Sequence, residues 1–368
     1  MIIGFPHMGN AFVTAKAVLD DLGVRYVMPP ESTQRTLELG ARHTPEGACL
    51  PLKITVGNLL EARALGADTQ LMVGSWGPCR FGYYCQMQRE VLEDAGFPMD
   101  CIHLEVCRAG PGELARRIRK LTGGLNVFEL LRASAAAAAL SERTDELERL
   151  YRHVRAREPG KSRAEEIWAA FRRDAREAYG TREMFRLIDS ARQKLRAVRI
   201  NPSAEPLRVG VIGEIYGTID QWTNLRLESR LGALGAEAER RVAIGEWIND
   251  YIIKKALHLP RNLDFAEAAG GYLETDIGGH ARETIGHAVL HARQGFDGAI
   301  QLYPLGCMPE IVAQGILPQV SRDYDFPVLT LIIDEMTGEA GYATRVEAFV
   351  DLLRQRREKR LQAAGERL

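Results

Sequence analysis

Cysteines are the residues of this sequence whose type and surroundings most clearly predict chemistry. The chain of 368 residues has six, at positions 49, 79, 85, 101, 107 and 307. No two of them form a Cys-x-x-Cys pair, so the local signature of a zinc ribbon, a ferredoxin-type cluster or a thioredoxin site is missing. Six are also too few for a disulfide scaffold, and in a reducing compartment we expect thiols or metal ligands. Any metal site must therefore be assembled from distant segments.

Cys49, Cys79 and Cys307 share a local context that favours a common site. Cys49 and Cys307 each stand two residues before a proline, at the predicted start of a helix, where backbone N–H groups stabilise a thiolate. Cys79 follows a predicted strand at Leu71–Gly74. We place all three at the carboxyl ends of strands, where open α/β sheets gather their sites. Three soft thiolates suit an iron–sulfur cluster or zinc and leave one metal position open.

Acidic residues after predicted strands are candidates for the same site: Glu214, Asp334, Glu335 and Glu339. Each could accept a hydrogen bond near a ligand or donate a proton, or instead cap a helix or close a loop. Glu214 and Glu335 are the candidates for catalytic residues.

A group of histidines at helical spacing is the other candidate for a metal site. It comprises His280, Glu283, His287 and His291, of which the last two are i, i+4 neighbours. A catalytic zinc site also needs a third ligand and a base, which the sequence does not identify. We therefore interpret this group as a helical face that is exposed or satisfied by its neighbours.

The elements that must position these residues are those of an α/β protein. Short apolar runs alternate with helical patterns in two blocks, which predicts parallel sheets built from βαβ units. Strands are expected at Met1–Phe5, Val24–Met28, Leu71–Gly74, Asp100–Val106, Leu207–Gly213, Ala299–Tyr303 and Val328–Ile333. Helices are expected at Ala11–Leu22 and Leu52–Leu65, and residues 126–200 show helical spacing without a strand.

The predicted architecture is two Rossmann-like domains with parallel sheets and a helical insert between them. The domain limits that we predict are 1–125 for the N-terminal α/β domain, 126–203 for the insert and 204–343 for the C-terminal α/β domain. A C-terminal amphipathic helix follows at 344–368.

Composition excludes several classes of protein. The formal net charge is −1, which gives no reason to expect binding to nucleic acid or to an anionic membrane. No uninterrupted apolar run of about 18 residues predicts a membrane span, and Met1–Pro6 does not resemble a signal peptide. We expect a cytoplasmic protein. Gly160-Lys161-Ser162 resembles the end of a phosphate loop, but Arg155 stands where that loop needs glycine.

Four stretches of the sequence resemble a known family. They are ACLPLK from Ala48, GPCRFGYYCQ from Gly77, PLGCMPEIVA from Pro304 and DEMTGEAG from Asp334. They look like the acyl-CoA dehydratase activase-related proteins of the 2-hydroxyacyl-CoA dehydratase, benzoyl-CoA reductase and double-cubane cluster protein superfamily. The resemblance covers nearly the whole chain outside 126–200.

The resemblance implies a cluster and its ligands. The dehydratase subunits have two cysteines about thirty residues apart and a third in the last domain, which together hold a [4Fe–4S] cluster. Carried over, this implies Cys49, Cys79 and Cys307 as ligands. We interpret Cys85, Cys101 and Cys107 as core thiols. The alternative is a double-cubane [8Fe–9S] cluster held by all six cysteines, as in part of the superfamily.

The resemblance also implies a function. It implies an iron–sulfur reductase or electron-transfer component, of a 2-hydroxyacyl-CoA dehydratase-like system, that works anaerobically. A separate ATP-hydrolysing activator with its own [4Fe–4S] cluster would supply low-potential electrons, and an acyl-CoA or another small molecule would accept them. A homologous subunit would complete a homo- or heterodimer. Two alternatives stay open: a non-catalytic, cluster-carrying assembly or relay subunit, and a structural zinc protein.

Overall fold

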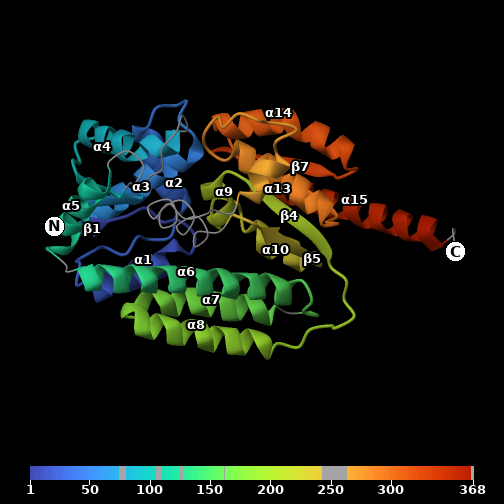
Figure 1. Cartoon of the computed structure of the whole chain (residues 1–368), viewed down its shortest axis with the longest axis horizontal. Coiled ribbons are helices and arrows are strands. Elements are labelled where there is room, and N and C mark those ends of the chain that lie inside the picture. The colour runs from blue at the N-terminus through green and yellow to red at the C-terminus, as the bar shows by residue number, and fades with distance from the viewer. Residues whose placement is uncertain (74–79, 105–109, 125–126, 161, 243–262, 366–368) are drawn as a thin grey trace.

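The computed structural model of the chain describes residues 1–73, 80–104, 110–124, 127–160, 162–242 and 263–365. It contains two α/β units and three long helices, and Figure 1 shows these helices running beneath both units. The three helices are α6 (Val127–Arg155), α7 (Arg163–Glu177) and α8 (Gly180–Arg196). Among the residues described, none of the helices is both long and apolar enough to cross a membrane.

The N-terminal sheet is parallel throughout. Its order is β1-β2-β3, formed by β1 (Ile3–Gly4), β2 (Thr69–Val73) and β3 (Asp100–Leu104). The strand predicted at Val24–Met28 is reduced to one parallel bridge, between Tyr26 and Ile3, on the free side of β1. The helices of this unit are α1 (Ala11–Asp21), α2 (Gln34–His43), α3 (Leu50–Ala64), α4 (Tyr84–Asp94) and α5 (Gly110–Thr122).

The C-terminal sheet is also parallel and repeats this order. Its strands are β4 (Leu207–Gly213), β5 (Ala236–Arg240), β6 (Gly298–Pro304) and β7 (Val328–Ile333), in the order β5-β4-β6-β7. We count the bridge at Tyr26 as the second strand of the N-terminal unit in chain order. In both units the second strand then lies on one side of the first, and the third and fourth strands lie on the other side of the first. The crevice of such a sheet opens at the carboxyl ends of its first and third strands. The helices of this unit are α9 (Ile215–Ile219), α10 (Leu227–Ala233), α12 (Asp264–Ala268), α13 (Ala281–Arg293), α14 (Met308–Asp323) and α15 (Glu339–Gly365).

Apolar side chains of the three long helices join the core of the N-terminal unit. Phe12 of α1 belongs to one buried cluster with Trp168 and Phe171 of α7. The rings of Tyr151 and Trp168 stack at 5.1 Å between centroids. The breaks between the three helices fall near Pro159 and Gly180. The helical insert is therefore packed onto the N-terminal unit through a shared core.

Helices α2 and α3 link the N-terminal unit to the core of the C-terminal unit. Leu50 and Ile54 of α3 are buried in one cluster with the sheet residues Val211 and Leu302. The glycine at position 57 lets α2 and α3 approach closely, since a Cβ there would lie 1.9 Å from the Thr36 carbonyl oxygen. The two α/β units thus share apolar core as well as a chain.

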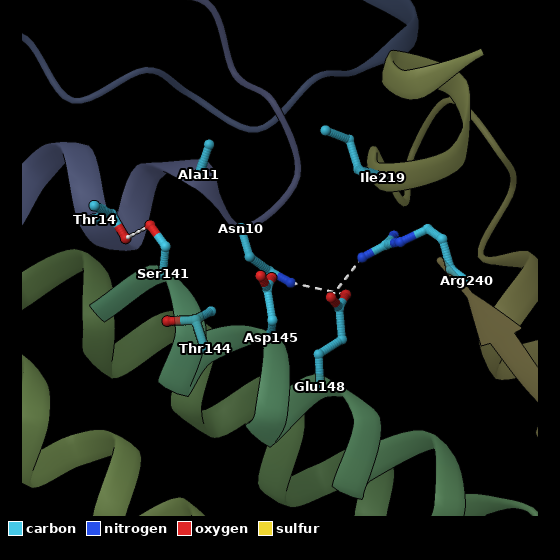
Figure 2. A pocket seen from close by; sticks show the side chains of 9 residues that line it. All are labelled: Asn10, Ala11, Thr14, Ser141, Thr144, Asp145, Glu148, Ile219 and Arg240. Atoms are coloured by element: carbon cyan, nitrogen blue, oxygen red, sulfur yellow. Dashed lines mark hydrogen bonds and ion pairs between the residues drawn. The ribbon is translucent and has the colours of Figure 1, made fainter. Parts of the chain in front are cut away.

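A buried polar junction joins all three parts of the chain (Figure 2). Glu148 of α6 accepts hydrogen bonds from Asn10 Nδ2 at 3.0 Å and from Arg240 Nη2 at 2.6 Å. Arg240 lies at the end of β5, and Asn10 directly precedes α1. A cavity of about 10 Å³ beside them has room for about one water molecule. Because all three side chains are buried, each depends on the others to satisfy its polar atoms.

The predicted α/β architecture is confirmed, with differences in detail. β5 and α2 were not predicted, α15 begins at Glu339 rather than at residue 344, and Val24–Met28 forms no regular strand. Cys101 lies within β3, inside the predicted strand Asp100–Val106.

Candidate functional site

Cys49 and Cys307 occupy equivalent positions at the start of two helices. Cys49 is the N-cap of α3 and Cys307 is the N-cap of α14, each with a proline in the first helical turn. Both side chains are buried thiols. N–H groups at a helix start carry partial positive charge, which stabilises a thiolate and favours anionic clusters.

The fold brings the segments of these two cysteines into contact, although they are 258 residues apart (307 − 49). Gly306 has φ +79°, and a Cβ built on it would lie 3.6 Å from the Gly47 carbonyl oxygen and 3.7 Å from Cys49 Cα. The backbone before Cys307 therefore lies against the backbone before Cys49, at the boundary between the two α/β units. Glycine is needed at 306 because this backbone conformation strains other residues.

Cys79, the third predicted ligand, lies outside the residues that the structure describes, and so does Cys107. In sequence, Cys79 follows β2, and Cys307 follows β6. When the Tyr26 bridge is counted as a strand, β2 and β6 are each the third strand of their unit in chain order. Cys49 follows α2 instead of a strand, which corrects its predicted placement. Within the described ranges, no three histidine, cysteine or acidic residues are grouped so as to hold a metal ion.

Tyr84 places a hydroxyl group on the Cys49 sulfur. Its Oη lies 2.7 Å from Cys49 Sγ, and the tyrosine is the buried first residue of α4. A hydroxyl that donates to a thiolate or to a cluster sulfur stabilises its negative charge. The sequence alone does not predict this contact, since no spacing rule links Tyr84 to a cysteine 35 residues earlier.

Glu310 places a buried carboxyl group in the first turn of α14, three residues after Cys307. Thr284 Oγ1 and Gln301 Nε2 each donate a hydrogen bond to it at 2.8 Å. Burial raises the pKa of Glu310 to about 7, with a smaller contribution from Glu214, against the effect of these hydrogen bonds. Glu310 can therefore hold or release a proton near neutral pH. Its place in the Cys-Met-Pro-Glu sequence was the signal that could have identified it.

Glu214 lies at the carboxyl end of β4 and caps a short helix. Its two carboxylate oxygens accept from the backbone N–H groups of Tyr216 and Gly217, at 2.9 and 2.8 Å. Burial raises the pKa of Glu214. Glu214 is therefore close to the expected crevice, but both of its oxygens already accept backbone hydrogen bonds.

The other acidic candidates stabilise a turn or form ion pairs between elements of the fold. Glu335 forms an ion pair with Lys53 of α3, which ties the two α/β units together. Asp334 accepts from Thr337 Oγ1 at 2.9 Å and closes the turn before α15. Glu339 pairs with Arg230.

A buried His–Asp pair also crosses the boundary between the units. His7 Nδ1 and Asp220 Oδ2 are 3.0 Å apart, and both side chains are buried. Burial tends to raise the pKa of Asp220, but hydrogen bonds from His7 and Thr223 outweigh it and keep that pKa below its usual value. Neither residue belongs to a motif that the sequence alone reveals.

The histidines of α13 face the core. Burial lowers the pKa of His287 to about 3 and that of His291 well below its usual value, so both rings are neutral. Neither ring nitrogen of His291 has a hydrogen-bond partner among the described residues. The ring lies over Gly210, where a Cβ would come within 2.2 Å of Nδ1. The predicted exposed or satisfied face is therefore wrong for His291, because periodicity does not show which face of a helix is buried.

Cys85 and Cys101 form a disulfide between α4 and β3. This corrects their interpretation as core thiols.

The arrangement as a whole places two buried thiols at helix starts near the boundary of the two α/β units, with a hydroxyl group on one thiol and a titratable acid three residues after the other. A scan against protein-family models and a search of curated protein sequences found no match to this chain.

Proposed function

We propose that the chain is an iron–sulfur redox protein whose cluster is held by Cys49, Cys79 and Cys307 at the boundary of its two α/β units. The observation that carries this proposal is the contact between the Gly306-Cys307 and Gly47–Cys49 segments. A metal centre shared by Cys49 and Cys307 would require these two segments, which are distant in the sequence, to lie against each other as they do.

The residues present fit a [4Fe–4S] cluster. Cys49 and Cys307 supply soft ligands at helix starts, and burial keeps water away from the sulfurs. When bound, such a cluster supplies one-electron redox chemistry, and three protein thiolates leave one iron open to a substrate. Tyr84 would donate its hydrogen bond to the sulfur of Cys49, which stabilises added negative charge. Glu310 would hold a proton three residues from a ligand.

We propose a hard-to-reduce acyl-CoA or similar small molecule as the acceptor, in the cytoplasm. The absence of a phosphate loop from the sequence supports delivery of electrons by a separate ATP-hydrolysing activator that carries its own [4Fe–4S] cluster. We further propose a second, homologous subunit as a partner.

Anaerobic reconstitution with iron and sulfide tests the proposal. We expect about four irons and four sulfides per chain for the wild type, with the absorbance of a [4Fe–4S] cluster. Cys49→Ala, Cys79→Ala and Cys307→Ala should each lose most of the iron. Cys107→Ala, at a cysteine outside the proposed ligand set, is the matched control and should retain it.

Two outcomes would contradict the proposed site. A colourless protein loaded with zinc would favour a structural metal site. About eight irons per chain, with loss of iron in the Cys85, Cys101 and Cys107 variants as well, would favour a double-cubane cluster.

A further inference from the structure

The first turn of α4 is tied to two other elements of the N-terminal unit through adjacent residues. Tyr84 contacts Cys49 Sγ at the start of α3, and Cys85 is bonded to Cys101 of β3. One turn later, Gln88 Nε2 donates to Thr55 Oγ1 of α3 at 2.9 Å. The disulfide is the only covalent bond among these contacts.

The two sulfurs of this disulfide lie in different surroundings. Cys101 is half-buried, whereas Cys85 is buried in the first turn of α4, an 11-residue helix. Gln70 of β2 donates to the Cys85 carbonyl oxygen at 2.9 Å, and its Nε2 also lies 3.7 Å from Cys85 Sγ. An incoming thiolate therefore reaches Cys101 more readily, and the helix start and the Gln70 amide both stabilise a thiolate on Cys85.

We propose that Cys85 and Cys101 form a reversible two-electron thiol–disulfide centre that controls how firmly Tyr84 is held against Cys49. Its reductant is a dithiol, and its oxidant is a low-molecular-weight disulfide. The thiol–disulfide centre stands on the described residues alone, while its effect on a redox cluster rests on the proposed function.

The reaction follows ordinary thiol–disulfide exchange. A thiolate of the dithiol attacks Cys101 Sγ, the bond between Cys101 and Cys85 breaks, and Cys85 leaves as a thiolate. The second thiol of the reductant then attacks its own sulfur in the mixed disulfide and releases Cys101. The reductant becomes a cyclic disulfide, and its two electrons and two protons end on Cys85 and Cys101.

Reduction should loosen the start of α4. The disulfide fixes Cys85 to β3, and Tyr84 is the preceding residue, so loss of the bond leaves only hydrogen bonds and packing to hold the tyrosine on Cys49. The contact of Gln88 with Thr55 lies one turn further along and holds the rest of the helix. The expected change is therefore local to the Cys49 site.

The test uses the full-length, metal-free protein, so that it does not depend on a cluster. The protein is equilibrated with oxidised and reduced dithiothreitol under argon, alkylated after denaturation and analysed by peptide mass spectrometry. Cys85 and Cys101 should be reduced as a pair. The ratio of reduced to oxidised pair should change tenfold for each ~30 mV in the potential of the dithiothreitol buffer. Under native conditions, iodoacetamide should label Cys49 several-fold faster in the reduced protein than in the oxidised protein.

Variants separate the thiol–disulfide centre from a general loss of structure. Cys101→Ser should label Cys49 at the rate of the reduced wild type, and Tyr84→Phe should label it fast in both redox states. Circular dichroism and thermal unfolding establish that each variant is folded. The proposal is overturned if Cys85 and Cys101 remain thiols in excess oxidised dithiothreitol, if either bonds to a different cysteine, or if the labelling of Cys49 does not respond to reduction. If these thiol–disulfide results are as expected but the reconstituted wild type binds no iron, the proposed function alone is refuted.

Discussion

The pH dependence of folding stability should report the burial of Glu310. Burial raises its pKa from an ordinary value of 4.5 to about 7, so the folded chain binds this proton more tightly than the unfolded chain does. The resulting stabilisation is fully present below about pH 4.5, and it is lost as the pH rises through about 7. The contribution of Glu310 to the stability of the wild type should therefore fall between mildly acidic and mildly alkaline pH.

The size of this change in stability follows from the difference between the pKa values of Glu310 in the folded and unfolded chain. Each unit of pH between the two pKa values changes the free energy of unfolding by about 1.4 kcal/mol. Between pH 5.5 and pH 8, Glu310 passes through about 1.5 units of that range, so its burial should cost the folded state about 2 kcal/mol.

Glu310→Gln is the variant that isolates the carboxyl group. A glutamine oxygen can accept from Gln301 Nε2, and its NH2 group can donate to the Thr284 hydroxyl, which can rotate to accept. Urea unfolding of the metal-free protein at pH 5.5 and pH 8 gives the change in the free energy of unfolding between the two pH values. This change should be about 2 kcal/mol less unfavourable in the variant than in the wild type. The exposed Glu205→Gln variant should behave like the wild type. Equal pH dependence in the wild type and Glu310→Gln would refute the reasoning.

Three further predictions concern the cluster site and the junction of the three parts. Tyr84→Phe should lower the midpoint potential of a bound cluster by about 40–90 mV in an anaerobic redox titration, since about 1–2 kcal/mol of hydrogen bonding to the sulfur is lost; exposed Tyr83→Phe should not shift it. Gly306→Ala should destabilise the apoprotein by about 1–2 kcal/mol in urea unfolding because φ is +79° there, whereas Gly315→Ala, with open space around it, should not. Arg240→Ala should cost about 3–5 kcal/mol because it leaves Glu148 buried with less positive charge beside it. Exposed Arg182→Ala is its control, and similar unfolding midpoints for the two would argue against the junction.

Two strands of the C-terminal sheet were predictable from the sequence because each is a short, largely apolar run. Leu207–Gly213 and Val328–Ile333 match β4 and β7 in full. β5 was missed because its sequence, Ala-Glu-Ala-Glu-Arg, has no β-branched or aromatic residue, and pairing with β4 is what makes it a strand.

The candidate site was predictable only in part. The Cys-x-Pro pattern correctly placed Cys49 and Cys307 at helix starts. Their approach depends on tertiary packing, which brings Gly306 against Gly47, and no local pattern carries that information. The Cys85–Cys101 bond also has no local signal in the sequence, since the two cysteines are 16 residues apart and belong to a helix and a strand.

The sharing of apolar core between the two α/β units has a consequence for how they can move relative to each other. Hinged two-lobed proteins admit their ligands by swinging the lobes apart. Here that motion would pull Leu50 and Ile54 out of contact with Val211 and Leu302 and expose them to water. The two α/β units should therefore move together rather than swing apart. A fragment ending before residue 204 would carry the same apolar side chains uncovered, so the chain should unfold as one cooperative body.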